Sequence, residues 1–359
     1  MRVYTLDGYH NTSPACQLAP AVRRTAAQVS SPQKLGASGA LRKAIFNDEP
    51  AHVYHLHGIW LRAMFYGAEK AKQAKRPYLI EVNGALDPLE LATKPYRKRL
   101  VRWWFQDRMF HEASCIHVNS GREARHLREL GFKAPIVNIP AGFNIEEGAE
   151  LLQIAENNPP VWAKEFQGRR ILLYLARIHE AKGIDDLIAA WAVVANKFTD
   201  WDLVIVGPGS AEDVLSRQRE CELLHIDRRC RWLGMVSDVE RAWLYDQAEI
   251  YTLPSHKENF GNTVQESLGY STPVITTTQT PWEKLAEWRC GWICEDNVES
   301  LTETLHRALS TEKSTLEAMG ERGRSMVHLK FSLRRVIDDQ LAVYSWLQGG
   351  VRPECLSAD

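Results

Sequence analysis

The chain has 359 residues, 45% of them hydrophobic and 25% charged, and its 44 basic and 45 acidic side chains give a net charge of −1. The length suits two domains rather than one core, and the near-neutral charge argues against a general nucleic-acid binder. The sequence shows neither a run of roughly 18 apolar residues nor the apolar core of a signal peptide, and its seven scattered cysteines are interpreted as buried free thiols, so we expect a cytoplasmic protein.

Short apolar segments alternate with longer amphipathic ones, a pattern typical of α/β proteins with parallel sheets. The strands predicted in the first half are Arg2–Leu6, Val53–His57, Tyr78–Val82, Cys115–Val118 and Ile136–Ile139. The helices predicted between them are Leu61–Ala74, Tyr96–Phe110 and Gly121–Leu130. These elements predict a first domain over residues 1–148.

The pattern breaks near the middle of the chain. Residues 146–167 are acidic, contain the run Asn157-Asn158-Pro159-Pro160 and show no sustained periodicity. We therefore predict an interdomain linker at residues 149–168.

A second series of strands and helices follows. Its predicted strands are Ile171–Leu175, Asp202–Val206, Arg231–Leu233, Ile250–Leu253 and Pro273–Thr276. Its predicted helices are Ile184–Asn196, Ala211–Leu224, Asp238–Asp246 and a helix from about Asn262 to Gly269, and the tail from Val298 onward is helical in pattern. This predicts a second domain over residues 169–328, with the strand ends of two doubly wound parallel sheets facing a central cleft, where open α/β sheets bind ligands.

The most informative segment is residues 253–266, LPSHKENFGNTVQE. A strand ends at Pro254, a polar loop follows, and a helix begins near Asn262. We expect Asn262 to cap this helix, and the amides of its first turn favour an anion such as a pyrophosphate. Glu258 in the loop and Glu266 in the helix can accept hydrogen bonds from a ligand rich in hydroxyl groups. A capped surface helix with two solvated glutamates is the alternative interpretation.

A basic element follows the first strand of the second domain. Arg177 and Lys182 lie before its first helix, where they can neutralise a pyrophosphate, a task that a metal ion performs in other enzymes. The alternatives are that Arg177 pairs with Glu180 and that Lys182 is solvated.

As a set, these motifs resemble the donor-binding half of the glycosyltransferase family 4 enzymes (glycosyl transferase group 1, of the exopolysaccharide and lipopolysaccharide type), which have the GT-B fold of two Rossmann-like domains. Glu258 and Glu266 match the family's E-x7-E motif, Arg177 and Lys182 match its basic pair, and Gly207 opens a matching strand-end turn. Further matches, in order along the chain, are Thr272-Pro273-Val274-Ile275, Thr280-Pro281-Trp282-Glu283 and Cys290-Gly291-Trp292.

The first half carries weaker matches to the same family. They are the strand ending in His57-Gly58, the turn at Ala85-Leu86-Asp87-Pro88, the strand and helix from Ile116 to Gly131, and the turn Ile139-Pro140-Ala141-Gly142-Phe143. By the same analogy, residues 329–359 are expected to include a helix that packs back on the first domain.

The resemblance implies a retaining glycosyltransferase that moves a sugar from a nucleotide diphosphate sugar to a glycan or lipid-linked glycan, in bacterial surface polysaccharide synthesis and without a metal or other cofactor. Glu266 would bind the ribose hydroxyls, Arg177 and Lys182 the pyrophosphate, and Glu258 the donor sugar. The remaining donor-binding positions are Gly207, Phe260, Gly261, Asn262 and Thr263. The departing nucleoside diphosphate needs its charge stabilised, and two cations with a helix N-terminus supply this.

The acceptor half departs from the family pattern at two places. Asn83-Gly84 stands where relatives have histidine before the glycine, and asparagine cannot take a proton at neutral pH. We expect that role to be altered or to have moved to His57, with Glu258, His57 and Asn83 as the catalytic positions. The glycine-rich loop after the first strand is reduced to Asp7-Gly8-Tyr9. Two alternatives stay open: a sugar-nucleotide-binding scaffold protein that has lost transfer, and a nucleotide-sugar epimerase, which would use acids between its domains.

Two other patterns are assigned structural roles. Asp200-Trp201-Asp202 has the D-x-D form of metal-dependent enzymes, but Asp202 begins a strand whose far end is Gly207, which places the pair away from the cleft. His55 and His57 share a strand face, and no carboxylate or thiol has convincing spacing to join them in a metal site. A dehydrogenase is poorly supported, because the run beginning at Gly207 lacks the third glycine of a dinucleotide fingerprint.

Residues 94–104 are basic and end in Trp103-Trp104. On a helix they can rest on anionic lipid headgroups or a lipid-linked acceptor, which would place the protein peripherally at the inner face of the membrane. A solvated helix with a buried tryptophan side is the preferred interpretation of this stretch.

Overall fold

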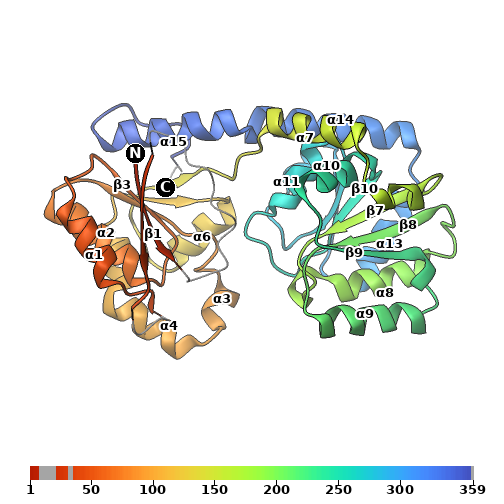
Figure 1. Cartoon of the computed structure of the whole chain (residues 1–359), viewed down its shortest axis with the longest axis horizontal. Coiled ribbons are helices and arrows are strands. Elements are labelled where there is room, and N and C mark those ends of the chain that lie inside the picture. The colour runs from red at the N-terminus through yellow and green to blue at the C-terminus, as the bar shows by residue number, and fades with distance from the viewer. Residues whose placement is uncertain (8–21, 31–34, 357–359) are drawn as a thin grey trace. The chain divides into compact units, whose positions relative to one another are not determined.

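The computed structural model describes residues 1–7, 22–30 and 35–356. The chain forms two compact units, Met1–Ile139 with Asp338–Asp359, and Pro140–Ile337 (Figure 1). The chain passes from the second unit back to the first within helix α15 (Leu333–Leu347). The C-terminal segment therefore belongs to the unit that contains the N-terminus.

The second unit is built on one sheet of six parallel strands in the order β12-β11-β10-β7-β8-β9. The strands are β7 (Arg170–Leu175), β8 (Trp201–Val206), β9 (Cys230–Gly234), β10 (Ile250–Leu253), β11 (Val274–Thr277) and β12 (Gly291–Cys294). From β7 the chain adds β8 and β9 on one side, and it then returns to add β10, β11 and β12 on the other. The strand order therefore reverses between β7 and β10, which is where doubly wound sheets bind ligands.

Helices cover both faces of this sheet (Figure 1). One face carries α8 (Ile184–Val194), α9 (Ala211–Leu223) and α13 (Val298–Leu309), and the other carries α10 (Asp238–Gln247) and α11 (Asn262–Gly269), while α14 (Lys313–Phe331) contributes to both cores.

Alternation along the strands sorts their apolar side chains between the two cores of this unit. Leu172 packs in the same core as Trp191 of α8, whereas Leu173 packs with Leu244 of α10. Each such buried side chain contributes about 1.5–3 kcal/mol, and burial on both faces explains why these strands read as continuous apolar runs.

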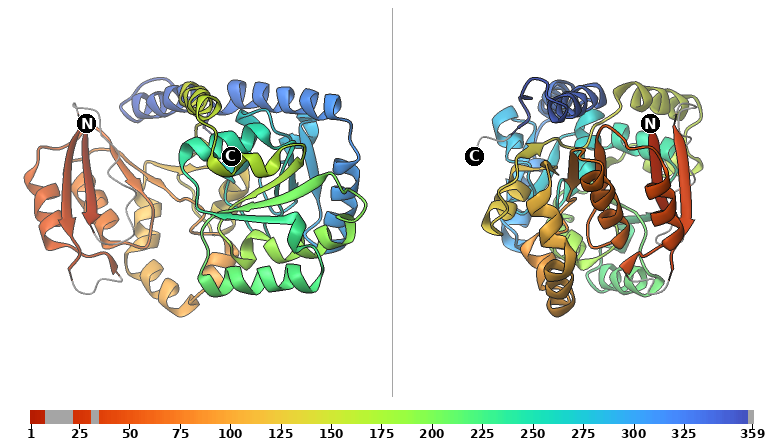
Figure 2. Two further views of the ribbon diagram at one scale, coloured as in Figure 1. Left: turned by 45° about the vertical axis from the view of Figure 1, so that its right-hand side comes forward. Right: turned by 90° about the vertical axis from the view of Figure 1, so that its left-hand side faces the viewer.

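The first unit contains a four-stranded parallel sheet in sequential order, with a second, two-stranded parallel sheet beside α1. The main sheet consists of β3 (Tyr54–His57), β4 (Tyr78–Glu81), β5 (Cys115–Val118) and β6 (Ile136–Asn138). Figure 2 shows β1 (Arg2–Asp7) and β2 (Arg23–Gln28) side by side. The helices are α1 (Gly39–Asn47), α2 (Arg62–Gln73), α3 (Pro88–Ala92), α4 (Pro95–Val101), α5 (Asp107–Glu112) and α6 (Gly121–Glu129).

Two predicted segments differ from the structure. The predicted helix Tyr96–Phe110 is divided into α4, a π-helical turn (Arg102–Gln106) and α5. The expected linker without periodicity is helix α7 (Ile145–Asn157) followed by a 3-10 helix (Val161–Phe166), and both belong to the second unit.

The acidic residues that suggested a linker are helix-start residues. The side chain of Asn144 accepts a hydrogen bond from the backbone N–H of Glu147, and Glu146 and Glu147 occupy the first turn of α7, where negative charge is stabilising. Ala155 and Phe166 are buried against α10, so this segment is a packed part of the core.

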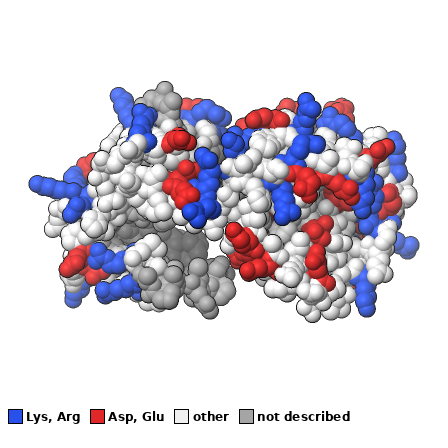
Figure 3. All heavy atoms as spheres, turned by 90° about the horizontal axis from the view of Figure 1, so that it is seen from above, with Lys and Arg blue, Asp and Glu red and all other residues white. Residues whose placement is uncertain are grey.

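Side chains of both charges are interspersed over the face shown in Figure 3, in keeping with the balanced composition. Among the described residues, no helix combines the length and the apolar character that crossing a bilayer requires. Five of the six described cysteines are buried and none forms a disulfide; Cys16, Gly8 and Tyr9 lie outside the described residues.

Candidate active site

Two loops meet at the point where the strand order of the second unit reverses. β7 and β10 are adjacent and parallel, so the loop after Leu175 and the loop after Leu253 leave the same edge of the sheet. The backbone N–H of His256 donates to the carbonyl of Ala181 at 3.2 Å and joins the two loops. The basic pair and the two glutamates that the sequence singles out therefore lie on neighbouring loops.

Lys182 and Glu258 form an ion pair across these loops, and the Ser255 hydroxyl also donates to Glu258 at 3.3 Å. The suggested solvated position for Lys182 is wrong, because its side chain is largely buried in this pair. Arg177 is exposed, and among the described residues its guanidinium has neither a hydrogen bond nor an ion pair, so the suggested pairing with Glu180 is also wrong. One cation is thus held in place and the other is available to an anion.

Glu266 lies on α11 and is mostly buried. The Tyr245 hydroxyl donates to its Oε2 at 3.0 Å, and the Arg241 Nε lies 3.6 Å from the same oxygen. Burial raises the pKa of Glu266 above its ordinary value, although Arg241 and the Tyr245 hydrogen bond oppose the shift. Its Oε1 accepts no hydrogen bond from the described residues, and it remains available to a hydroxyl-bearing ligand.

The start of α11 differs in one detail from the prediction. Asn262 is the first residue of the helix rather than its cap, and Gly261, in the left-handed region at φ 83°, is the cap without a side-chain hydrogen bond. Two buried side chains hold the residues on either side of Gly261. Trp282 Nε1 donates to the Phe260 carbonyl at 2.5 Å, and the Tyr251 hydroxyl donates to Thr263 Oγ1 at 2.7 Å. The backbone N–H of Val264 donates to the Gly261 carbonyl at 3.0 Å, whereas those of Asn262 and Thr263 have no partner among the described residues and remain available to an anion.

Glycines let the loops at this edge approach each other closely. Gly207, after β8, has φ 136°, and a Cβ there would overlap the carbonyl oxygen of Ala176. Gly183, before α8, has φ 66°, and a Cβ there would overlap the carbonyl oxygen of Pro254. The contact between the β7 and β8 loops therefore requires glycine at position 207, and the contact between the β7 and β10 loops requires it at position 183.

We expect Gly183→Ala to lower the free energy of unfolding by at least about 2 kcal/mol beyond the penalty for a left-handed φ, because the new methyl group forces the β7 and β10 loops apart. Gly168→Ala is the matched control, since Gly168 has φ 73° but open space around its Cβ position, and only the left-handed penalty of about 1–2 kcal/mol applies. Denaturant unfolding of both variants measures the difference. Equal destabilisation would show that the loop contact is not tight.

In the first unit, His57 and Glu81 occupy paired positions at the ends of β3 and β4. The side chain of His57 is 66% exposed, and its Nδ1 is hydrogen-bonded to the Glu81 carboxylate, while His55 Nε2 lies 3.7 Å from the same carboxylate. Burial opposes ionisation of Glu81, but the His57 hydrogen bond and the neighbouring histidines outweigh it and lower the pKa of Glu81 to about 2. Glu81 therefore holds an exposed imidazole in a fixed orientation.

The expectation that the histidines lack a carboxylate partner is wrong, since Glu81 reaches both from the neighbouring strand. Potential ligand atoms of His55, His57 and Glu81 lie within 4.8 Å of one another. The two imidazole rings are stacked, with centroids 4.0 Å apart and planes 25° apart. The hydrogen bond between His57 Nδ1 and Glu81 fixes the exposed ring, and His55 Nε2 has no hydrogen-bond partner among the described residues.

Asn83 shapes the turn after β4. Its φ of 53° lies in the left-handed region, which asparagine tolerates better than most residues, and its Oδ1 accepts a hydrogen bond from Asn119 Nδ2 at 2.7 Å. Glu123 holds the same turn through the backbone N–H groups of Gly84 and Asn119.

The D-x-D run lies at the start of β8, at the opposite end of that strand from Gly207, as predicted. Asp202 is buried and pairs with Arg169 at 2.7 Å and Arg229 at 3.0 Å, so it serves an internal ion-pair network.

A group that was not found from the sequence consists of Asp186, His256 and Asp296. His256 Nδ1 lies 2.6 Å from Asp296 Oδ1, and this contact ties the β10 loop to the segment before α13.

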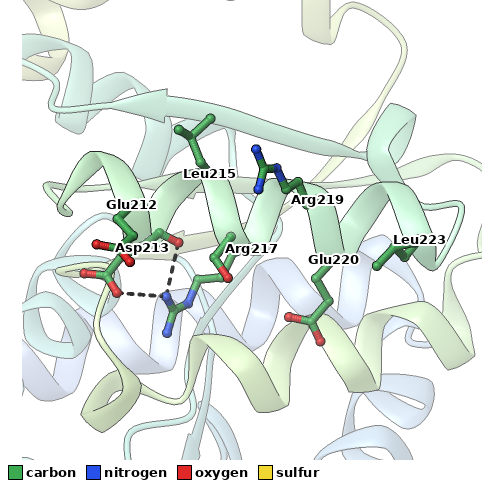
Figure 4. Close-up of a pocket in the computed structure, with 8 residues that line it drawn as sticks. Glu212, Asp213, Leu215, Arg217, Arg219, Glu220 and Leu223 are labelled. Atoms are coloured by element: carbon green, nitrogen blue, oxygen red, sulfur yellow. Dashed lines mark hydrogen bonds and ion pairs between the residues drawn. The ribbon is translucent and has the colours of Figure 1, made fainter.

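A surface hollow along α9 is separate from these groups (Figure 4). Its lining comes from α9 alone, and the dashed contacts in the figure join Arg217 to Asp213 on the same helix, while Arg217 also pairs with Asp185 of α8 at 2.8 Å. The Arg217–Asp185 pair attaches α9 to α8, so we assign a structural role to this part of the hollow.

Two family models match the chain. The model described as Glycosyl transferase 4-like domain matches residues 1–142, and the model described as Glycosyl transferases group 1 matches residues 161–326. The residues of the doubly wound sheet, the two glutamates and the basic pair thus all lie within the range that the group 1 model matches. The chain belongs to the group 1, family 4-like glycosyltransferases and has their GT-B fold.

Solved structures and curated proteins agree with this assignment. The sucrose-phosphate synthase of Thermosynechococcus elongatus aligns with a TM-score of 0.74 at 19% identity, covering 97% of this chain and 89% of that one. Anabaena HepE in complex with UDP and glucose aligns at 0.68 and 14% identity, covering 89% and 86%. The capsular polysaccharide biosynthesis glycosyltransferase CapM of Staphylococcus aureus is 24% identical over 57% of this chain and 54% of its own length. The match spans about half the length of the first curated relatives.

Proposed function

We propose that this protein transfers a sugar from a nucleotide diphosphate sugar to a glycan or lipid-linked glycan, with retention of anomeric configuration and without a metal ion. The observation that carries the proposal is the arrangement at the β7–β10 switch point. At this point Arg177 is a cation unpaired among the described residues and Lys182 a paired one, and the two carboxylates are Glu258 and Glu266. These groups come from the β7 and β10 loops and from α11, whose start has no side-chain cap.

Each group suits one part of such a donor. Arg177 and Lys182 supply positive charge for a pyrophosphate, and the first-turn amides of α11 add hydrogen-bond donors. Glu266 has an open oxygen for the ribose hydroxyls, and Glu258, once Lys182 turns to the phosphates, has acceptor capacity for sugar hydroxyls. HepE, whose structure contains UDP and glucose, has the same fold, which supports a nucleotide-sugar donor.

The acceptor side of the proposal rests on the relatives and on the first unit. CapM is named for capsular polysaccharide biosynthesis, and we place this chain in surface polysaccharide synthesis by that likeness. His57, oriented by Glu81, is the group we assign to the acceptor or donor sugar.

A thermal-shift panel with UDP, GDP, ADP, CDP and NAD, each with and without magnesium, tests the donor site. One nucleoside diphosphate at about 100 times its Kd is expected to stabilise the protein by about 2.7 kcal/mol, equally with and without magnesium. In Glu266→Gln the shift is expected to disappear, because hydrogen bonds from ribose hydroxyls to a charged acceptor are worth about 1.5–3 kcal/mol each.

The same variant is expected to keep or gain stability without ligand. The folded-state pKa of Glu266 is raised. Glu266 therefore adds to the free energy of unfolding at pH values below its unfolded-state pKa, and this contribution is lost as the pH rises through its folded-state pKa. An amide avoids that loss at neutral pH and can still accept from Tyr245. Glu287→Gln, at an exposed position of α12 (Lys284–Trp288), is the matched control and should bind normally. A nucleotide shift that persists in Glu266→Gln would remove the proposed role of this residue.

A binding or scaffold protein that has lost transfer remains the second candidate. Its supporting observation is Asn83, which stands in place of the family's histidine and is held by Asn119. Nucleotide binding without either donor hydrolysis or transfer would favour that candidate over the enzyme.

A further inference from the structure

The segment around α4 exposes a stripe of large apolar side chains. Tyr96, Leu100, Trp103 and Trp104 are 87%, 62%, 80% and 51% exposed. They follow one another at spacings of four, three and one residues, which places them along one side of a helix. No residue of α4 is fully buried: Val101 is partly buried against the core of this unit, whereas Tyr96 and Leu100 remain exposed.

The same segment carries positive charge, and only part of it is paired with acidic residues. Residues 94–104 contain five basic and no acidic residues, in a chain whose net charge is −1. Lys98 contacts Glu90, and Arg102 pairs with Asp107 at 2.8 Å. Lys94, Arg97 and Arg99 are exposed, and none forms an ion pair with a described residue.

The tryptophans are exposed on an anchored backbone. The neighbouring Phe105 and Gln106 are buried, and Gln106 Oε1 accepts a hydrogen bond from the backbone N–H of Trp60 at 2.9 Å. The guanidinium of Arg62 lies 4.6 Å from the Trp104 ring centroid and holds that ring in place. The suggested solvated helix with a buried tryptophan side is therefore wrong, because Phe105 and Gln106 fill the buried positions and both indoles face solvent.

We propose that α4 and the following π-helical turn bind the surface of an anionic lipid bilayer. Indole and phenol rings favour the headgroup level of a membrane, because one end is apolar and the other forms hydrogen bonds. Each Lys or Arg near an anionic surface strengthens binding by about fivefold. A protein partner is less well matched, since aromatic rings interleaved with unpaired cations and without carboxylates fit a surface that is negative outside and apolar beneath.

This contact does not depend on the donor site. It would bring the first unit, which carries His57, to the membrane surface where a lipid-linked acceptor is found. The bilayer surface itself, rather than one lipid molecule, is the proposed partner.

Co-sedimentation of the full chain with vesicles tests the proposal. The wild-type protein is expected to sediment with phosphatidylcholine vesicles that contain phosphatidylglycerol at low salt, and to remain in solution with pure phosphatidylcholine or at high salt. The triple variant Lys94→Gln, Arg97→Gln, Arg99→Gln is expected to lose about a hundredfold in affinity. Trp103→Ala with Trp104→Ala should weaken binding while leaving its salt dependence intact.

A charge-matched control separates local from general electrostatics. Lys43, Arg76 and Lys133 are exposed cations of the same unit outside this segment, and their replacement by glutamine should leave binding within about threefold of wild type. Nucleotide-dependent thermal shifts of every variant confirm that the second unit is intact. Failure of the wild-type protein to bind anionic vesicles at low salt would overturn the proposal. Equal binding by the triple variant and its control, or a Trp103-dependent dimer in place of vesicle binding, would do the same.

Discussion

Replacing Lys182 with methionine is expected to lower kcat for donor cleavage by about 10²–10³-fold. The departing nucleoside diphosphate gains negative charge in the transition state, and removal of one preorganised electrostatic contact to such a charge has an effect of this size. Arg177→Met should have a comparable effect on kcat, because the second cation acts on the same charge. Release of the nucleoside diphosphate that the thermal-shift panel identifies provides the assay.

The two substitutions should differ in what they do to the unliganded protein. Lys182 pairs with Glu258 in a largely buried contact, so its removal leaves that carboxylate with Ser255 alone and should lower stability by about 1–3 kcal/mol. Arg177 has no such partner among the described residues, so Arg177→Met should unfold like wild type.

Lys182→Arg keeps the charge and should recover part of the lost rate. Lys284→Met, at an exposed position on α12, controls for the loss of a charge elsewhere in the unit. If both Arg177→Met and Lys182→Met kept kcat within about threefold of wild type, the charge-stabilising role of this pair would be untenable.

The inner strands of the second unit, β7, β8, β10 and β11, were predictable because they are buried on both faces. Segments such as Ile171–Leu175 and Ile250–Leu253 are short and apolar, and they alternate with amphipathic helices of the right length. The edge strand β12 is only partly buried and was not predicted. Strand β2 (Arg23–Gln28) was not predicted, because its sequence RRTAAQ has no apolar run and the strand is largely exposed beside β1. Helix α7 was missed for a related reason, since its helix-start carboxylates resemble a solvated linker.

At the candidate site, too, some residues could be predicted from the sequence and their partners from other elements could not. The E-x7-E pair and the basic pair were found from their positions after strand ends and from their match to the family's motifs, while spacing alone left structural alternatives open. Tyr245 reaches Glu266 from another helix, 21 residues away, and Glu81 reaches His57 across a strand pair formed by a crossover helix. Such partners depend on which strands become neighbours, and a single sequence does not specify that pairing residue by residue.

The His57 and Asn83 positions are expected to differ sharply in their effect on turnover. His57→Ala should lower kcat by about 10²-fold, because the exposed imidazole held by Glu81 is the group placed to exchange a proton or a hydrogen bond with a sugar hydroxyl. Asn83→Ala should lower it by about tenfold or less, because Asn83 acts through the shape of its turn and its bond to Asn119.

Two further variants separate orientation from chemistry. Glu81→Gln keeps the shape of the side chain but removes a charge that stays ionised in any ordinary assay, since its pKa is about 2, so kcat should fall to a value between those of wild type and His57→Ala. Asn83→Gly keeps the left-handed backbone and should retain more activity than Asn83→Ala. His52→Ala, an exposed histidine of the same unit, is the control. A larger loss in Asn83→Ala than in His57→Ala would reverse the assignment and give the turn after β4, rather than the histidine after β3, the direct role at the sugar.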